Sequence, residues 1–403
     1  MASVSVSKDS HHAQAEAKAS WPCFEQDEID AVVRVLRSGK VSYWTGEEGR
    51  LFEEEFAAFA GCRYGVAVAN GTVALELALY ALGVGEGDEV VVTSRTFIAS
   101  ASAVVLRGAK PVFADVDPNS QNFTAESIRA VLSPRTKAIL AVHLAGWPCE
   151  MDEITTLARE HGIKVIEDCA QAHGATYKGR PVGCFGDAAA WSFCQDKVMT
   201  TGGEGGMLTT NRHDVWEKAW SYKDHGKSID ALRNQQDLPG FQWLHDSFGT
   251  NWRMTEIQSA IGRVALRKVP RWVGIRRRNA ALLTERFQSI PGLRVTVPPR
   301  HIGHAYYRYY TFVRPEMLKR GWDRDRILAE INREGIPCFT GSCSEVYLER
   351  AFERAGLQPA ERLPVAKQLG ETSLAFLVHP TLSEKDMQDV ANAVERVMKK
   401  ACR

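Results

Sequence analysis

Two residues of this 403-residue chain, Lys197 and Asp168, have the types and surroundings needed for covalent chemistry with an organic cofactor. Lys197 follows the small-residue apolar run 188–193 and precedes the glycine-rich run 200–206, and Asp168 follows the apolar run 165–167. A lysine placed after a buried strand can hold an aldehyde cofactor as a Schiff base and can later act as a general base. A carboxylate at the end of an earlier strand can pair with a ring nitrogen. Together they are typical of enzymes that use pyridoxal phosphate (PLP).

In such a pair the carboxylate would stabilise the protonated ring nitrogen, and the size of this effect can be calculated. At about 4 Å and an effective dielectric of about 20, opposite charges gain roughly 4 kcal/mol, or about three pKa units. That gain would keep a ring nitrogen protonated and the ring an electron sink. Each residue alone also fits a structural role, Asp168 as a helix N-cap and Lys197 as an exposed loop lysine.

A third feature lies at Asn70-Gly71-Thr72, where an apolar run gives way to a helical pattern. Backbone N–H groups at a helix N-terminus, with the Thr72 hydroxyl, can bind a phosphate. The alternative is an ordinary strand–helix turn with Thr72 as the N-cap. In an open α/β sheet ligands bind beyond the carboxyl ends of the strands, and all three features fall at such ends.

The elements that must position these residues alternate along the chain. Short apolar runs separated by helical patterns indicate βαβ units and a mostly parallel sheet. We expect strands at 66–69, 89–93, 111–116, 138–143, 164–167 and 188–193, and helices at 25–38, 72–82, 97–106, 124–132, 151–161, 255–266 and onward to about 287. Beyond Pro291 we expect strands near 306–313 and a last helix capped by Ser383 with Asp386. The expected division is a disordered tail at 1–19, a large domain at 20–265 and a small α+β domain at 266–403.

Composition excludes several classes of protein. A net charge of +1 gives no overall field for nucleic acid or an anionic membrane, and the run Arg276-Arg277-Arg278 fits a solvated helix face. No apolar run has membrane-spanning length. Nine scattered cysteines without Cys-x-x-Cys spacing argue against a zinc site and a disulfide framework, so we expect a cytoplasmic protein without metal.

The motifs and their order resemble the DegT/DnrJ/StrS sugar-nucleotide aminotransferases, a branch of the fold type I PLP enzymes. The resemblance runs from about residue 21 to 395. It rests on Gly71-Thr72, on the run Glu167-Asp168-x-Ala-Gln-Ala-His-Gly, on Ser192-Phe193 ahead of Lys197, on 204–206, on 251–258 and on His379-Pro380. Histidine replaces the lysine in related dehydratases, so Lys197 favours transamination.

The resemblance implies a role for each matching residue. Lys197 would form the Schiff base and transfer protons, Asp168 would pair with the pyridine nitrogen, and Gln171 would contact the side of the ring that bears the phenolic oxygen. Phe97 would stack on the ring. Three residues would hold the phosphate, Gly71, Thr72 and Ser192. Asn251 would reach the phosphate in the neighbouring subunit, so the resemblance implies a homodimer with shared sites. Phe97 as simple core and Asn251 as a turn residue remain the alternatives.

The implied reaction moves an amino group, with glutamate as the donor, to a keto group of a nucleotide-linked deoxysugar for a surface polysaccharide or a glycosylated metabolite. The alternatives are a keto-cyclitol aminotransferase, a carbon–sulfur lyase on the same fold, and a non-catalytic PLP-binding regulator. Two places depart from the usual family pattern: an extra glycine at Gly202-Gly203, and the segment 341–347, which usually shapes the sugar pocket.

Overall fold

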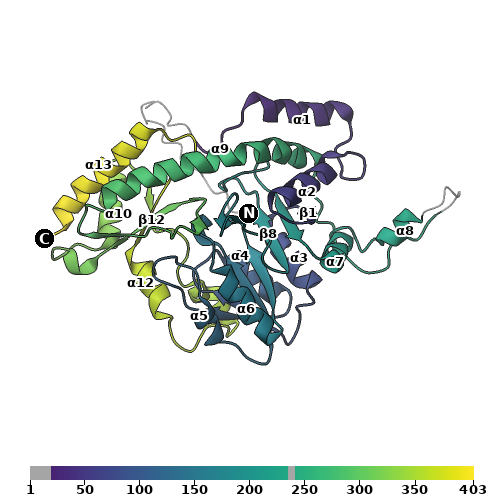
Figure 1. The fold of residues 1–403 in the computed structure, drawn as a ribbon, viewed down its shortest axis with the longest axis horizontal. Coiled ribbons are helices and arrows are strands. Elements are labelled where there is room, and N and C mark those ends of the chain that lie inside the picture. The colour runs from purple at the N-terminus through teal and green to yellow at the C-terminus, as the bar shows by residue number, and fades with distance from the viewer. Residues whose placement is uncertain (1–19, 235–240) are drawn as a thin grey trace, which may run out of the picture.

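The structure, a computed structural model, describes residues 20–234 and 241–403. Its centre is a seven-stranded sheet in the order β1-β9-β8-β5-β4-β2-β3 (Figure 1). β9 runs antiparallel to both of its neighbours, and the other paired strands are parallel. The expected α/β fold with a mostly parallel sheet is confirmed. The strands are β1 Tyr64–Val68, β2 Glu89–Thr93, β3 Lys110–Ala114, β4 Thr136–Val142, β5 Lys164–Asp168, β8 Ala188–Ser192 and β9 Gly206–Thr210.

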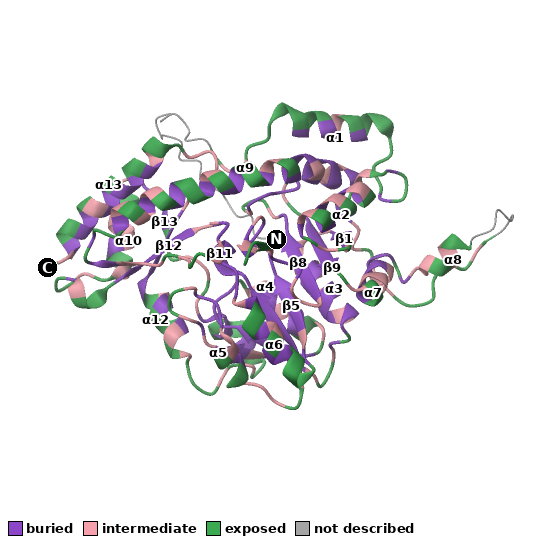
Figure 2. Cartoon of the chain, viewed as in Figure 1, coloured by how far each residue is buried: buried purple, intermediate pink, exposed green. Residues whose placement is uncertain are grey.

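Both faces of this sheet are buried, because successive side chains of each strand enter different cores (Figure 2). In β2, Val90 and Val92 pack with helices α3 (Gly71–Ala81), α4 (Ile98–Leu106) and α7 (His213–Lys223). Val91, between them, packs on the other face with α6 (Met151–His161). On that same face α2 (Glu48–Phe59) and α9 (Glu256–Phe287) cover β1, β8 and β9.

The long helix α9 joins the large sheet to the C-terminal part of the chain (Figure 1). The sequence pattern predicted two helical stretches here, and they form one continuous helix of 32 residues that contains Pro270. Val269 and Val273 pack in the core of the large sheet, whereas Leu283 and Phe287 pack in the small C-terminal core. Helix α1 (Gln26–Ser38) packs against the first part of α9. We keep 20–265 and 266–403 as the proposed division, and the expected tail at 1–19 lies outside the described residues.

The C-terminal part is a four-stranded antiparallel sheet covered by helices, as expected for a small α+β domain. The strand order is β10 (Leu293–Val295), β12 (Tyr309–Val313), β14 (Ser373–Phe376) and β13 (Cys338–Phe339). Helices α10 (Arg324–Arg333) and α13 (Glu384–Ala401) pack on this sheet. The expected cap of the last helix is confirmed, since Ser383 and Asp386 form a capping box. The remaining elements are α5 Ala125–Arg129, β6 Thr176–Tyr177, β7 Arg180–Pro181, α8 Ile229–Arg233, β11 Ile302–Gly303, α11 Arg350–Arg354, α12 Pro364–Thr372 and three short 3-10 helices at 144–146, 315–317 and 346–348.

The elements that were not predicted from the sequence include α2, β9 and α7 around the large sheet, and β10, β13, β14, α10 and α12 in the C-terminal part. Among the described residues no helix is long and apolar enough to span a membrane.

Candidate active site

A cavity of about 800 Å³ lies beyond the carboxyl ends of β1, β5 and β8, and the small domain forms its other wall. The ends of the parallel strands meet along one edge of the sheet, so side chains far apart in the sequence converge there. Seven of the eight residues expected at the site line this cavity: Gly71, Thr72, Phe97, Asp168, Gln171, Ser192 and Lys197. The eighth, Asn251, does not.

Lys197 lies inside the cavity, which excludes an exposed loop lysine. Its side chain is 16% exposed, with Nζ 3.8 Å from Asp196 Oδ1 and 4.9 Å from the centre of the Tyr307 ring. The indole N–H of Trp21 donates to the Lys197 carbonyl at 2.8 Å and holds the loop. Burial alone would lower the pKa of Lys197, but Tyr307, Asp196 and Asp168 outweigh it and the pKa is raised. The amine is therefore fixed at the cavity wall.

Asp168 ends β5 with a buried carboxylate. Ser100 Oγ donates to Oδ2 at 2.7 Å, and the Ala170 N–H donates to Oδ1 at 3.1 Å. The described residues between β5 and β6 form no helix, so the alternative of Asp168 as a helix N-cap is wrong, and the second bond closes only a local turn. Burial raises the pKa of this carboxyl above its ordinary value, and these bonds offset only part of that rise. A buried carboxylate that borders a cavity is ready to pair with a cationic ligand atom.

A candidate phosphate site is formed by the first turn of α3 and by the end of β8, which both line the cavity. The N-cap of α3 is Asn70, not Thr72, because Asn70 Oδ1 accepts the Val73 N–H at 3.1 Å. The N–H groups of Gly71 and Thr72 in the first turn have no intrahelical partners and remain available for an anion. A side chain at Gly71 would not fit, since its Cβ would lie 2.6 Å from Ser192 Cβ.

Two further residues of the cavity wall differ in exposure, since Gln171 is buried and Phe97 is exposed. Gln171 is buried, and its Oε1 accepts the Ala145 N–H at 2.7 Å, so the amide nitrogen is left as a donor. Phe97 precedes α4 and is 65% exposed, which excludes the simple core role. An apolar ring held in the open at a cavity is available to stack on a bound ring.

Asn251 lies away from the cavity of its own chain. It is exposed and forms an isolated bridge with Asp224. It therefore lies in a bridged segment and not in a turn, and its contact with a neighbouring subunit stays a prediction.

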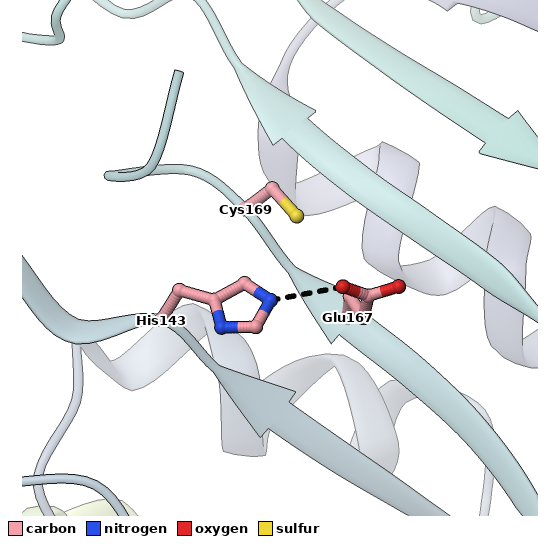
Figure 3. Close-up of side chains that lie close together, drawn as sticks. All are labelled: His143, Glu167 and Cys169. Atoms are coloured by element: carbon pink, nitrogen blue, oxygen red, sulfur yellow. Dashed lines mark hydrogen bonds and ion pairs between the residues drawn. The ribbon is translucent and has the colours of Figure 1, made fainter. Parts of the chain in front are cut away.

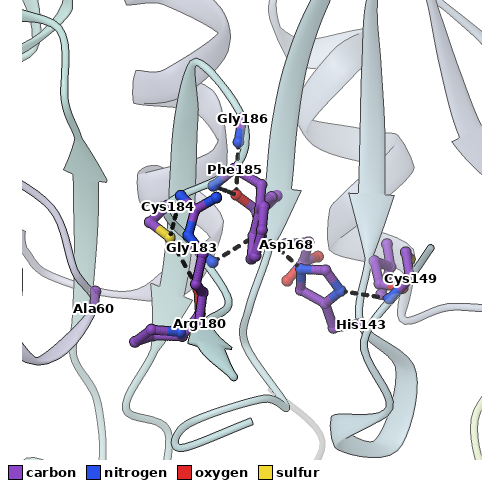
Figure 4. A network of polar contacts seen from close by, with 12 residues as sticks. Ala60, His143, Cys149, Asp168, Arg180, Gly183, Cys184, Phe185 and Gly186 are labelled. Carbon is purple, nitrogen blue, oxygen red and sulfur yellow. Dashed lines mark hydrogen bonds and ion pairs between the residues drawn. The ribbon is translucent and has the colours of Figure 1, made fainter. Parts of the chain in front are cut away.

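Behind Asp168 lies a buried ion-pair network that the sequence analysis did not identify. His143 Nε2 contacts Glu167 Oε2 at 3.0 Å, and the Cys149 N–H donates to His143 Nδ1 at 3.0 Å (Figures 3 and 4). The Glu167 carboxylate also accepts three backbone N–H groups at 2.8 Å each, from Gly183, Phe185 and Gly186. Burial alone would raise the pKa of Glu167, but these donors outweigh it and the pKa is lowered. The signal was visible in the sequence as a second carboxylate inside an apolar strand.

Cys169 completes a cluster with His143 and Glu167 whose ligand atoms lie within 4.8 Å of one another (Figure 3). Both histidine nitrogens and both carboxylate oxygens are already engaged in the bonds described above. Burial raises the pKa of the Cys169 thiol well above its ordinary value, which disfavours the thiolate that a metal needs. We therefore interpret the cluster as structural. It joins the ends of β4 and β5, where the backbone N–H of His143 also donates to the Asp168 carbonyl at 3.1 Å.

The two unusual segments have clear structural roles. Gly202 and Gly203 have φ values of +90° and +130°, a region that side chains other than glycine rarely adopt. The segment 341–347 is bonded to the end of β2: the Thr96 N–H donates to the Cys343 carbonyl at 3.1 Å, and the Val346 N–H donates to the Ser94 carbonyl at 2.9 Å. The pairing brings this segment into the cavity wall.

Arg95 fixes the same segment from inside the protein. It is fully buried and donates to Gln121 Oε1 at 3.0 Å, to Ser344 Oγ at 2.7 Å and to Ser373 Oγ at 3.1 Å. Its guanidinium also lies over the ring of Tyr310. A further buried arginine corrects the sequence analysis: Arg276 is 1% exposed, so the interpretation of 276–278 as a solvated face is wrong at that position.

The groups that line the cavity fit PLP. The Lys197 amine can bind an aldehyde, and the buried Asp168 carboxylate can face a protonated ring nitrogen. The N-terminus of α3, which packs closely on Ser192 through Gly71, can bind a phosphate. Phe97 is placed to cover one face of the ring.

Comparison with known proteins also indicates a PLP-dependent aminotransferase. The model of the DegT/DnrJ/EryC1/StrS aminotransferase family matches residues 22–395. GDP-perosamine synthase of Caulobacter vibrioides is 37% identical over 364 residues, which cover 88% of this chain and 92% of that protein. UDP-N-acetyl-3-dehydro-alpha-D-glucosamine 3-aminotransferase of Acidithiobacillus ferrooxidans is 36% identical over 358 residues, covering 89% and 90%.

Among solved structures, an aminotransferase from Psychrobacter cryohalolentis has a TM-score of 0.93 at 55% identity, covering 95% of this chain and 99% of that one. This chain belongs to the DegT/DnrJ/EryC1/StrS aminotransferase family and is a PLP-dependent aminotransferase.

Proposed function

We propose that this aminotransferase moves an amino group from an amino acid, glutamate, to a keto group of a nucleotide-linked deoxysugar. The two relatives named above carry GDP and UDP in their names, and one of them names a 3-dehydro sugar, which is a ketone. The product would serve a surface polysaccharide or a glycosylated metabolite. The proposal includes a cytoplasmic location, with which the nine free cysteines agree.

The observation that carries this proposal is the placement of Lys197 and Asp168 in one cavity of about 800 Å³ that the small domain also lines. The volume lies within the range of small-molecule sites. The carboxylate ends β5, the amine lies in the loop that follows the adjacent strand β8, and the segment 341–347 lines the same cavity. In the proposal, the side of the cavity with Lys197 and Asp168 therefore holds the cofactor, and the side with the segment 341–347 selects the substrate.

PLP, when bound, supplies an aldehyde and a ring that withdraws electrons from the substrate carbon. Lys197 Nζ would hold that aldehyde and would then carry the proton between the substrate carbon and the cofactor. Asp168 would keep the ring nitrogen protonated, Gln171 would donate to the phenolic oxygen side, and Phe97 would cover the ring. Gly71, Thr72 and Ser192 would bind the phosphate.

A shared site in a homodimer is part of the proposal. Asn251 is exposed and does not line the cavity of its own chain, and in the proposal it serves the site of a neighbouring subunit. Chains that carry Lys197→Ala can be mixed with chains that carry Asn251→Ala. Partial recovery of activity in the heterodimer is expected, because one of its two sites would have both residues. No recovery in verified heterodimers would reject the shared site.

The cofactor assignment is tested on the purified protein. It should be yellow, and borohydride should attach the cofactor covalently to the peptide that contains Lys197. A colourless protein that does not respond to added PLP, or labelling of a different lysine, would contradict the assignment.

The substrate class is tested by separate half-reactions. The protein is first converted to the pyridoxamine form with glutamate and freed of donor, and keto-sugar nucleotides are then added one at a time. Return of the original absorbance band identifies the acceptor. Return of the band with keto-cyclitols alone would replace the sugar nucleotide in the proposal.

A further inference from the structure

A side cavity of about 370 Å³ adjoins the main one. The two cavities share Asp196, Tyr307, Arg308 and Phe339 in their walls. None of these residues was identified from the sequence, and the roles proposed above do not use them. They lie beside Lys197, so a ligand bound between the two cavities would be close to the reacting atoms.

Arg308 is the accessible cation of this shared wall. Its side chain is 25% exposed, and Nη2 lies 3.7 Å from Asp196 Oδ2, too far for a hydrogen bond. The guanidinium stacks on Tyr307, with its carbon 5.1 Å from the ring centre, and lies 5.6 Å from that of Phe339. Within the described parts of the chain the guanidinium has no hydrogen bond. It is thus positioned by two aromatic rings while its N–H donors remain available to a ligand.

Asp196 connects this cation to the reacting amine. Its Oδ1 lies 3.8 Å from Lys197 Nζ, and its Oδ2 lies 3.7 Å from Arg308 and accepts a hydrogen bond from the Tyr307 hydroxyl. Burial alone would raise the pKa of Asp196, but Lys197, Tyr307 and Arg308 outweigh it and the pKa is lowered. The two cations therefore lie on either side of one carboxylate.

We propose that Arg308 binds a carboxylate of the amino donor, with Asp196 as the weaker partner that it contacts before the donor arrives. This inference rests on the proposed function, in which the donor is an amino acid. A planar guanidinium binds a carboxylate through two parallel hydrogen bonds, which the long contact to Asp196 does not provide. Asp196 keeps the Tyr307 hydroxyl and Lys197 as partners when Arg308 turns to the donor.

Distance favours a donor carboxylate over the diphosphate of a sugar nucleotide. The amino nitrogen and the carboxylates of an amino acid are separated by only a few bonds, whereas a sugar ring separates the keto carbon from the diphosphate. Arg308 and Lys197 contact the same carboxylate, so the short ligand fits this spacing.

Arg276 also lines the side cavity, but it is 1% exposed and donates to the Tyr307 carbonyl at 3.3 Å. Its Nε and Nη2 have no hydrogen-bond partner among the described residues, but they are buried, whereas Arg308 is 25% exposed at the wall that the two cavities share and is the arginine that a ligand there reaches.

The test compares Arg308→Gln, Arg308→Lys and the wild-type holoenzyme in two measurements. Calorimetry with glutarate, which has two carboxylates and no amine, measures binding without reaction. We expect Arg308→Gln to weaken glutarate binding about 10- to 100-fold, the range for hydrogen bonds to a charged group, and Arg308→Lys to be intermediate. Stopped-flow absorbance should show a similar decrease in the half-reaction with glutamate, and a change of less than about threefold in the half-reaction with the keto-sugar nucleotide.

Arg314→Gln is the matched control, because Arg314 is an exposed arginine at the other end of β12. It should change neither measurement. Equal glutarate affinity in Arg308→Gln and the wild type, or a loss confined to the keto-sugar half-reaction, would overturn the inference. A wild-type protein that binds glutarate through Arg308 but does not react with glutamate would instead reject the donor in the proposed function.

Discussion

The two ends of the active-site cavity are built in different ways. At the cofactor end, Asp168 and Ser192 are the last residues of β5 and β8, and Gly71 begins α3 directly after β1. At the substrate end, Arg308 precedes a strand of the small domain, Asp196 lies in a loop, and the segment 341–347 has no regular structure before its short 3-10 turn. Lys197 is the exception at the cofactor end, because it lies in the same loop as Asp196, where Trp21 holds its carbonyl. Apart from Lys197, one end is fixed by the sheet and the other by side-chain contacts between segments.

We infer that this difference separates the residues proposed to hold the cofactor from those proposed to select the substrate. Backbone hydrogen bonds of a buried sheet hold strand ends with little freedom, which suits groups that must meet a reacting atom within a fraction of an ångström. Loops tolerate substitution without loss of the fold, so they can change the ligand that is accepted. We therefore expect substitutions at the cofactor end to abolish both half-reactions and substitutions at the substrate end to affect one.

The largest effect is expected for Lys197→Ala. Loss of the amine removes both the attachment point and the proton carrier, so turnover should fall by at least about 10⁴-fold in both half-reactions. Steady-state assays and the absorbance spectrum of the PLP-loaded protein check this. Lys137→Ala removes a lysine at the opposite end of the sheet, where β4 begins, and should change neither. Slowing of a single half-reaction in Lys197→Ala would contradict the proposed role.

Asp168→Asn should have the second largest effect. The amide keeps the shape of the side chain but loses the charge, which we expect to be worth roughly 4 kcal/mol to a protonated ring nitrogen, or about a 10³-fold decrease in both half-reactions. Single-turnover rates measure the decrease, and the absorbance of the bound cofactor at several pH values reports its protonation. Asp152→Asn, on the exposed face of α6, is the control. If Asp168→Asn lost only the keto-sugar half-reaction, the cofactor end and the substrate end of the cavity would not have separate roles.

The sequence predicted the cofactor end well for a physical reason. The periodicity of apolar residues predicts strands and helices, and a polar residue at the end of a buried strand can be recognised because its neighbours are apolar. For the same reason the large sheet was predicted strand by strand, apart from β9. That strand, Gly206–Thr210, directly follows the glycine-rich run and carries no apolar alternation of its own.

The substrate end could not be predicted in this way, because its residues come together only through tertiary contacts. Arg308 and Asp196 lie 112 positions apart, and neither stands in a pattern that indicates a ligand site. The burial of Arg95 and Arg276 could not be predicted either, because the neighbouring sequence does not distinguish a buried arginine from a surface one.

Arg95→Gln should affect mainly the substrate end. The shorter amide cannot reach all three of the oxygens that Arg95 holds, so the segment 341–347 should lose its fixed position while Lys197 stays in place. We expect the KM for the keto-sugar nucleotide to rise about tenfold, and the half-reaction with glutamate to change less than about threefold. Separate half-reaction kinetics measure both values.

Arg107→Gln is the control for that experiment, since Arg107 also stacks on tyrosine rings but lies at the C-terminal end of α4, away from the segment 341–347. A variant of Arg95 that slowed both half-reactions equally would show that the two ends of the cavity are mechanically coupled. The chain of hydroxyls from Thr96 through Ser100 to Asp168 would then be the connection to examine.

The smallest effect on activity is expected at His173, which belongs to the core behind the cofactor end and acts on stability. Its ring is fully buried among Phe56, Trp191 and Phe193, and neither ring nitrogen has a hydrogen-bond partner among the described residues. Burial lowers the pKa of His173 from 6.5 to about 3. Between these two pH values the unfolded chain binds more protons than the folded one, so stability falls as the pH is lowered through that window.

His173→Phe removes this dependence while keeping an aromatic ring. Between pH 7.5 and 5.0 the variant should lose about 2 kcal/mol less of its free energy of unfolding than the wild type, as measured by urea titration at both pH values. His161→Phe, at the exposed end of α6, should leave the wild-type dependence unchanged. Equal losses in His173→Phe and the wild type would mean that His173 is charged or hydrogen-bonded in the folded protein. The core behind the cofactor end would then admit a charge or a hydrogen-bond partner, and it would be less rigidly packed than we infer from the buried sheet.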